Sequence, residues 1–271
     1  MQKTPDLNQL TSQSCEIVAA VAEFIRGETG KVRAADIEDK SWNSLVSYVD
    51  KTAEQQLVTQ LQKLLPGAVF LTEEGTVEQS QGEFQWIIDP LDGTTNFLHQ
   101  VPCFSISVAL RHRQNSVLGI VYEINLSECF SAWKGGGAFL NGRPIQVSAN
   151  ATLKDSLLAT GFPYYDYDRI KAYLRALESF MQTTRGIRRL GSAAVDLAYV
   201  ACGRFDAFFE YSLNPWDVAA GAFIVQEAGG RVADFAGENN FLFGKEIIAA
   251  NPAIFGLVSQ VIQSEFSISP D

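Results

Sequence analysis

Histidine, cysteine and basic residues are scarce in this chain of 271 residues, and each shortage excludes a class of protein. Two histidines, His99 and His112, are too few for a histidine-rich zinc or iron site. The four cysteines lie far apart and form no CxxC pair, which indicates reduced thiols rather than a zinc ribbon or a disulfide framework. A net charge of −10 disfavours general binding to nucleic acid or membrane surfaces, which attract basic patches. A phosphorylated substrate is still compatible with this negative charge, because bound cations reverse the sign of the local electric field.

Long apolar runs are missing as well. No stretch approaches the roughly 20 residues that span a bilayer. Residues 1–10 lack a basic region followed by an apolar run, so we expect no secretory signal. The chain does contain 46% hydrophobic residues, enough for a substantial core. We therefore expect a soluble cytoplasmic protein without membrane partners and without direct nucleic-acid binding.

The predicted secondary structure mixes helices and strands. Helices are expected over residues 7–26 and 45–65, separated by a polar segment, residues 27–43, that is typical of a mobile loop or flexible hairpin. Short β runs between residues 105 and 147 predict an antiparallel meander. The other expected elements are strands at 69–71, 157–160, 205–209 and 247–250, and helices at 168–182, 192–202, 215–228 and 252–262.

No linker separates the N-terminal half, about residues 1–150, from the C-terminal half, about residues 151–271. We therefore expect a single domain over residues 1–271. The order of the elements predicts an α/β (α+β) fold with alternating layers of helices and strands.

The most informative segment is WIIDPLDGTTNF at residues 86–97, where an apolar strand leads into two carboxylates, Asp89 and Asp92. Pro90 biases Asp89 towards an extended conformation, and Asp92-Gly93 marks a turn. Thr94 begins a predicted helix whose free N–H groups attract an anion. Two acids at a strand end suit a hard cation held against a phosphate. The simpler alternative is an aspartate-capped turn after a strand.

Two other strand or helix ends also carry acids. Glu73 follows the strand at 69–71, where an ordinary solvent-facing acid is the alternative. Asp217 lies in the first turn of a helix that begins after Asn214-Pro215, and an acid there also complements the helix dipole. The residues after Asp217 are apolar on every face, which predicts a buried helix whose N-terminus opens into a cleft. Carboxylate oxygens suit Mg²⁺ or Mn²⁺, and a pair of such ions can clamp a phosphoryl displacement.

Three separated segments together resemble the inositol monophosphatase family of Mg²⁺-dependent, lithium-sensitive phosphatases, over nearly the whole chain. They are LTEEG at residues 71–75, WIIDPLDGTTNFLH at 86–99, and PWDVAAG at 215–221 with EAGG at 227–230. The resemblance implies a layered αβαβα fold and a homodimer. It also implies two or three Mg²⁺ ions per subunit. The first would be bound by Glu73, Asp89 and the Leu91 carbonyl, the second by Asp89, Asp92 and Asp217, and the third by Glu73 with water.

The resemblance also implies roles in binding substrate. Thr94, with Glu73, would orient the attacking water, and the N–H groups of Gly93 and Thr94 would receive the phosphate. Glu210 falls where inositol phosphatases keep an acid that binds a hydroxyl, although an ordinary strand-end acid is an equal alternative. The segment that contacts the ring hydroxyls in the family corresponds to Gly191, Ser192 and Ala193.

One position departs from the family pattern. In the segment NSLVS at residues 43–47, Ser44 stands where the family has an aspartate that hydrogen-bonds the water-orienting threonine. General-base assistance is typically worth about 10²–10⁴-fold, so we expect a slower enzyme. Asp50 lies two helical turns further along, and we do not expect it to take this role.

The sequence thus predicts a Mg²⁺-dependent phosphomonoesterase that hydrolyses a sugar or cyclitol phosphate by direct attack of a metal-activated water. Glu210 favours myo-inositol monophosphate. Fructose 1,6-bisphosphate, adenosine 3′,5′-bisphosphate and histidinol phosphate are the alternatives within the family. From a different class, the chain is a weakly catalytic homologue that regulates or binds another protein, an alternative for which Ser44 gives slight support.

Overall fold

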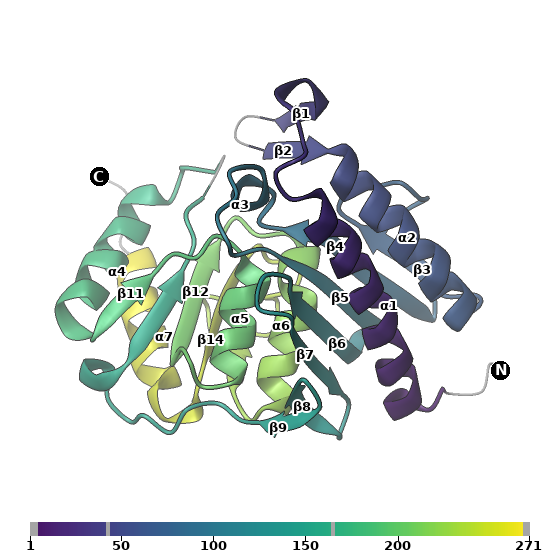
Figure 1. Ribbon diagram of the computed structural model, residues 1–271. Coiled ribbons are helices and arrows are strands. Elements are labelled where there is room, and N and C mark those ends of the chain that lie inside the picture. Colours follow the sequence, from purple (N-terminus) through teal and green to yellow (C-terminus); the bar gives the residue numbers. More distant parts are fainter. Residues whose placement is uncertain (1–4, 42–43, 164–165, 268–271) are drawn as a thin grey trace.

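The computed structural model describes residues 5–41, 44–163 and 166–267. Five layers are stacked side by side in the order helices, sheet, helices, sheet, helices (Figure 1). This is the αβαβα arrangement that the resemblance implied. The layers alternate because each sheet has two faces to bury and each helix pair covers one of them.

The larger sheet has the order β3-β4-β5-β6-β7-β8-β9. Strands β3 and β4 are parallel, and every later pair is antiparallel, which confirms the predicted meander. The bounds of its strands are β3 (Val69–Thr72), β4 (Phe84–Asp92), β5 (Ser105–His112), β6 (Asn115–Glu123), β7 (Glu128–Trp133), β8 (Gly137–Leu140) and β9 (Arg143–Ile145).

The smaller sheet has the order β11-β10-β12-β14-β13. Strands β11, β10 and β12 are parallel, and β14 runs antiparallel to both β12 and β13. Strands β11 and β13 are three residues long, too short to give a sequence signal, and were not predicted. The strands are β10 (Leu157–Thr160), β11 (Gly186–Arg188), β12 (Ala207–Tyr211), β13 (Arg231–Ala233) and β14 (Glu246–Ala250).

Helices α5 (Ala193–Ala201) and α6 (Pro215–Glu227) form the middle layer between the sheets. As predicted, α6 is buried on every face over residues 218–225. Its backbone packs so closely on β6 that a side chain at Gly119 would lie 2.8 Å from the Ala220 carbonyl. The core around α6 contains residues from both halves of the chain, so both halves contribute to the packing of this middle layer.

Four other long helices cover the outer faces. Helices α1 (Leu7–Glu28) and α2 (Tyr48–Leu64) lie on the larger sheet, and α4 (Ile170–Thr183) and α7 (Pro252–Phe266) on the smaller one (Figure 1). No helix in the described ranges combines the length and apolar character needed to cross a membrane.

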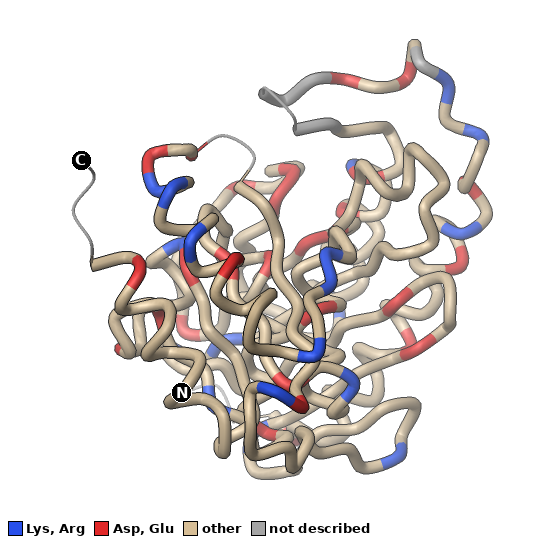
Figure 2. Tube along the Cα trace, turned by 90° about the vertical axis from the view of Figure 1, so that its left-hand side faces the viewer, with Lys and Arg blue, Asp and Glu red and all other residues tan. Residues whose placement is uncertain are grey.

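The predicted second helix begins too early. Residues 44–47 form strand β2 (Ser44–Ser47), which pairs with β1 (Ile37–Ser41) in a small hairpin, so the alternative of a hairpin for this polar segment is confirmed. The helix begins only at Tyr48, because the Ser47 hydroxyl accepts from the Val49 N–H and the Asp50 carboxylate accepts from the Ser47 N–H. The hairpin stands above the rest of the fold (Figures 1 and 2), and Figure 2 shows acidic and basic residues interspersed along that side.

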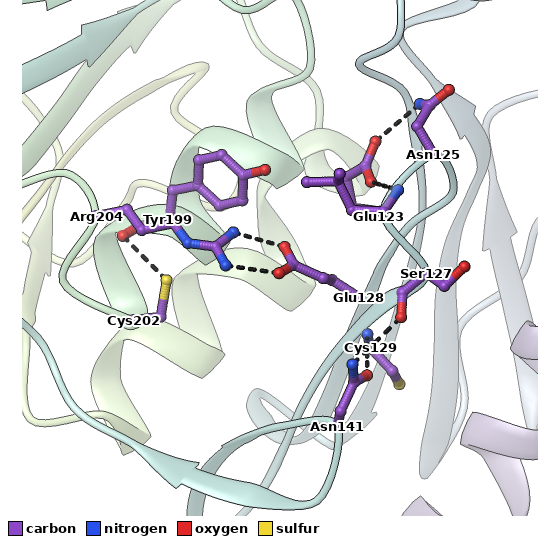
Figure 3. A network of polar contacts seen from close by, with 10 residues as sticks. Glu123, Asn125, Ser127, Glu128, Cys129, Asn141, Tyr199, Cys202 and Arg204 are labelled. Atoms are coloured by element: carbon purple, nitrogen blue, oxygen red, sulfur yellow. Dashed lines mark hydrogen bonds and ion pairs between the residues drawn. The ribbon is translucent and has the colours of Figure 1, made fainter.

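A bidentate ion pair links the middle helices to the larger sheet (Figure 3). Arg204, just after α5, donates to both carboxylate oxygens of Glu128 on β7, at 2.5 and 2.6 Å. The Tyr199 ring lies 4.6 Å beneath the guanidinium and fixes its plane. Because a planar guanidinium matches a carboxylate at two points, this contact orients the two layers as well as joining them.

Candidate active site

A pocket opens where β3 and β4 end and where α3 (Thr94–Leu98), α5 and α6 begin. Strand ends and helix starts meet here because β3 and β4 run parallel into it, while α5 and α6 both begin at the same side of the middle layer. The residues that line it are Glu73, Asp92, Gly93, Thr94, Thr95, Asn96, Gly161, Arg189, Gly191, Ser192, Ala193, Asp196, Glu210, Ser212, Leu213, Asn214 and Asp217.

Every predicted site residue except Asp89 and Leu91 lines this pocket. Asp89 and Leu91 lie directly behind its wall, with side chains 2% and 1% exposed. The ladder between β4 and β5 is interrupted between Asp89 and Asp92, so the strand bulges at Pro90, which has no N–H to donate. Both acids stay paired with β5, Asp89 with Ser107 and Asp92 with Ser105, and of the two only Asp92 lines the pocket.

Asp92 is held by α5. Its Oδ2 atom accepts the Ser192 hydroxyl at 2.7 Å and the Ala194 N–H at 2.8 Å. These bonds fasten the N-terminus of α5, where Ser192 is also the cap, to the end of β4. The segment 191–193, predicted to contact substrate, is therefore placed by the same carboxylate that is predicted to bind metal.

Asp217 lies in the first turn of α6, as predicted. Its Oδ2 atom accepts the N–H of Asn214 at 2.7 Å, which completes a capping box. The other oxygen is not used by this cap. Asp217 thus serves the helix and still presents an oxygen at the pocket that it lines.

Burial and neighbouring negative charges both disfavour the ionised form of these carboxylates. Burial, and then the charges of Glu73, Asp92 and Asp217, raise the pKa of Asp89 well above its ordinary value. Burial is also the main cause that raises the pKa of Asp92 to about 6 and the pKa of Asp217 well above its ordinary value. Negative charge concentrated in a buried place is expensive unless a cation neutralises it.

The donor set fits a hard divalent ion, since it offers carboxylate oxygens and the backbone carbonyl of Leu91. Within the described residues, no three His, Cys, Asp or Glu side chains are yet arranged closely enough to hold a metal as they stand. The observation that supports a cation is therefore the gathering of these acids in one largely buried place.

Thr94 has an acidic partner that the sequence analysis rejected. Its hydroxyl lies 2.9 Å from Asp50 Oδ1 and 2.9 Å from the Leu91 carbonyl. The expectation that Asp50 lies too far along the helix was wrong, because α2 begins three residues later than predicted and Asp50 occupies its first turn. The motif Ser47-x-x-Asp50 is a capping signature, and it indicates that the helix begins after Ser47 with Asp50 in its first turn. The side chain of Ser44 lies outside the described residues.

A second acid of α2 supports the same region. Glu54, fully buried and one turn after Asp50, accepts the Thr72 hydroxyl at 2.9 Å and the Glu74 N–H at 2.7 Å. It also accepts the N–H and the hydroxyl of Thr76, both at 2.7 Å. The turn that carries Glu73 is therefore fixed on both sides by one carboxylate.

Glu210 proves to be a pocket residue rather than an outward strand-end acid. It is 7% exposed, and burial raises its pKa to about 8. Gly161 makes room for it, since a Cβ at that position would lie 2.1 Å from the Glu210 carboxyl group.

Two further pocket residues, Arg189 and Asp196, gave no sequence signal, and a third, Asn96, belongs to the 86–97 segment but had no predicted role. Asn96 donates to the carbonyls of Cys103 and Leu190, at 2.7 and 2.8 Å, and so ties α3 to the segment before α5. Asp196 is buried in α5, and burial raises its pKa well above the ordinary value. Their positions depend on how distant segments pack.

Comparison with known proteins gives consistent matches along the whole chain. The sequence model of the inositol monophosphatase family matches residues 6–265 of this chain. The chain is 42% identical over 249 residues to the Nus factor SuhB of Pseudomonas aeruginosa, covering 90% of this chain and 92% of that protein. It is 39% identical over 239 residues to the inositol-1-monophosphatase of Mesorhizobium japonicum, covering 88% and 90%.

Solved structures agree with this result. The crystal structure of the extragenic suppressor protein suhB from Bartonella henselae matches with a TM-score of 0.87 and 37% identity, covering 96% of this chain and 99% of that one. An IMPase of Thermotoga maritima matches with a TM-score of 0.86 and 36% identity, covering 94% and 96%.

Proposed function

Because this chain belongs to the inositol monophosphatase family, we propose that it is a Mg²⁺-dependent phosphomonoesterase that acts on a sugar or cyclitol phosphate, with myo-inositol monophosphate as the favoured substrate. The observation that carries the proposal is the convergence of Glu73, Asp92 and Asp217 on a pocket that also contains Thr94. These acids and the Thr94 hydroxyl come from separate elements and line one pocket. Residues that served only as turn or cap residues of their own elements would not be expected to lie together.

The proposed metal ligands are the ones named from the sequence. Glu73, Asp89 and the Leu91 carbonyl would hold one Mg²⁺, and Asp89, Asp92 and Asp217 a second. Glu73 with water would hold a third, and Mn²⁺ would fit the same oxygen donors. When bound, the ions neutralise the acids and supply positive charge for the phosphate and for ionisation of water.

Thr94 and Asp50 would orient the attacking water. A hydroxyl has one proton to donate and two lone pairs to accept with. While Thr94 donates to Asp50, a lone pair of its hydroxyl oxygen would accept a hydrogen bond from the water and so direct the water oxygen into the pocket. Burial raises the pKa of Asp50, which makes this carboxylate a stronger proton acceptor than an exposed aspartate.

The phosphate and the alcohol would be held by different walls. Gly93 and Thr94 line the pocket at the start of α3, where Gly93 has a left-handed backbone with φ of 97°, and their N–H groups would receive the phosphate. Glu210 and the segment Gly191, Ser192 and Ala193 also line the pocket and would contact the hydroxyls of a cyclitol. A buried carboxyl group suits hydroxyl partners, because hydrogen bonds replace its lost water.

A second function is favoured by the names of several relatives. Proteins named Nus factor SuhB or putative Nus factor SuhB are 40–44% identical to this chain. The alternative proposal is therefore a regulatory homologue with weak catalysis. A cytoplasmic location, a homodimer and sensitivity to lithium complete the first proposal, on the strength of the family resemblance.

Phosphate release from a panel of substrates separates these functions. The panel contains myo-inositol 1-phosphate, fructose 1,6-bisphosphate, adenosine 3′,5′-bisphosphate and histidinol phosphate, each with Mg²⁺ and with added Li⁺. We expect fastest release from the inositol ester and inhibition by Li⁺. Faster release from another ester would make that ester the preferred substrate. No release from any of the four would contradict the enzymatic proposal and favour the regulatory one.

A further inference from the structure

A second cavity lies on the larger sheet and is distinct from the catalytic pocket. Its volume is about 620 Å³, within the range of small-molecule sites. It is bounded by the turn between β5 and β6, by the segment before β4, and by Phe243 from the segment between β13 and β14. It shares no lining residue with the catalytic pocket.

The chemistry of this lining contrasts with the rest of the chain. Ten residues line the cavity and none is acidic, whereas the whole chain carries a net charge of −10. Two of the ten are arginines, Arg111 and Arg113, and four are glutamines. Arg113 is paired with Glu83 at 3.3 Å and points largely to solvent, so the charge that remains available belongs to Arg111.

Arg111 is only weakly satisfied. Its Nη2 donates to the Gln114 carbonyl at 3.2 Å, and its Nη1 reaches the neutral Gln85 Oε1 at 3.5 Å. The Nε–H is buried and has no hydrogen-bond partner. Among the described residues, no carboxylate forms an ion pair with Arg111. A partly buried guanidinium that lacks a counter-ion is costly, which points to an anion as the missing partner.

The guanidinium and the wall beside it are held in place. The Phe243 ring packs over the Arg111 guanidinium, 5.2 Å from its centre. Gln85 is fixed by a bond from its amide to the Ser80 carbonyl at 2.7 Å. Gln79 exchanges hydrogen bonds with Thr72 at 2.9 and 3.2 Å. A fixed fork of donors beside fixed amides is organised for a ligand before the ligand arrives.

We propose that this cavity is a second ligand site, which binds a small phosphate ester through Arg111. A phosphate group offers three oxygens, enough to accept from both Nη groups of Arg111 together, with Arg113 at the rim. The neutral glutamine amides on the walls suit an uncharged, hydroxyl-bearing remainder of the ligand. This site does not depend on the proposed catalytic function.

Calorimetric titration without metal tests the proposal. Inorganic phosphate and glycerol 3-phosphate are titrated into the protein in buffer with EDTA, where the catalytic carboxylates repel anions and no catalysis occurs. We expect saturable binding of both probes to the wild-type protein. Arg111→Gln should weaken it by about tenfold or more, the usual effect of losing a charged hydrogen bond.

Two further variants make the result specific. Arg143→Gln removes an exposed arginine on β9, the opposite edge strand of the sheet, and should bind as the wild type does. Arg111→Lys keeps the charge but loses the fork, so its affinity should fall between those of the wild type and Arg111→Gln. Absence of saturable binding to the wild type, or equal affinity for Arg111→Gln, overturns the proposal whatever the melting temperatures of the variants.

Discussion

The Thr94 hydroxyl lies 2.9 Å from the Asp50 carboxylate, although the two residues are 44 positions apart. This contact joins the start of α2 to the turn after β4. It therefore restores the acidic partner that the sequence analysis considered lost at Ser44.

Asp50→Asn should lower kcat by about 10²–10⁴-fold and leave KM nearly unchanged, because it removes a proton acceptor and no substrate contact. The amide oxygen of asparagine still accepts the Ser47 N–H, so the helix cap survives. Steady-state kinetics with the preferred substrate measures the effect. Thermal unfolding of the variant checks that the loss is not one of folding, and an unchanged kcat would show that Asp50 has no part in the reaction.

Ser44→Asp should not raise the rate by more than about threefold, since Thr94 already has an acidic partner. Parallel assays of this variant and the wild type give the answer. A large gain in kcat would mean that the original interpretation of Ser44 was right and that Asp50 is a poor substitute.

Removal of one repelling carboxylate gives an effect on stability that is independent of activity. In EDTA, Asp217→Asn should be at least as stable as the wild type, because burial and neighbouring charges disfavour the ionised form of Asp217. Mg²⁺ should raise the melting temperature of the wild type and have little effect on the variant, and the variant should lose its activity. Asp155→Asn, at an exposed surface position, is the control. Retained activity in Asp217→Asn would refute the ligand assignment.

Glu210 predicts a stability that falls with pH. Burial raises its pKa from 4.5 to about 8, so between these values the folded protein binds a proton that the unfolded chain has lost. The free energy of unfolding should then decrease with rising pH, by up to about 1.4 kcal/mol per pH unit from this group. Urea unfolding in EDTA at pH 5, 6, 7 and 8, in steps of about one unit, measures this pH dependence of the free energy of unfolding. Glu210→Gln should flatten the slope, whereas Glu16→Gln, exposed on α1, should not.

Gly161→Ala should raise KM for inositol phosphate by about tenfold, because the added methyl group displaces the Glu210 carboxyl group. In a Glu210→Ala background the same substitution should cost much less, since the group that it displaces is gone. Equal effects in both backgrounds would mean that Gly161 acts through the backbone and not through Glu210.

The sequence predicted those parts of the site that are local in the chain. Asp89 and Asp92 share one motif, and Asp217 is indicated by the helix cap before it and by the apolar helix that follows it. Asp50 was missed because its role depends on where α2 begins and on a contact across the fold. Arg189 and Asp196 were missed because only the packing of α5 against β12 brings them to the pocket. The short strands β11 and β13 were missed for a related reason, since partners in the sheet rather than their own residues make them extended.

Helix α2 carries both Asp50 and Glu54, four positions apart and hence on one face. The first turns of this one helix therefore set the spacing between the hydroxyl of Thr94 and the turn that carries Glu73. Thermal fraying of its first turns would release both at once, so catalytic activity and the helicity of this segment should disappear in a single transition. We therefore expect no warm, partly active state in which only one of the two remains in place.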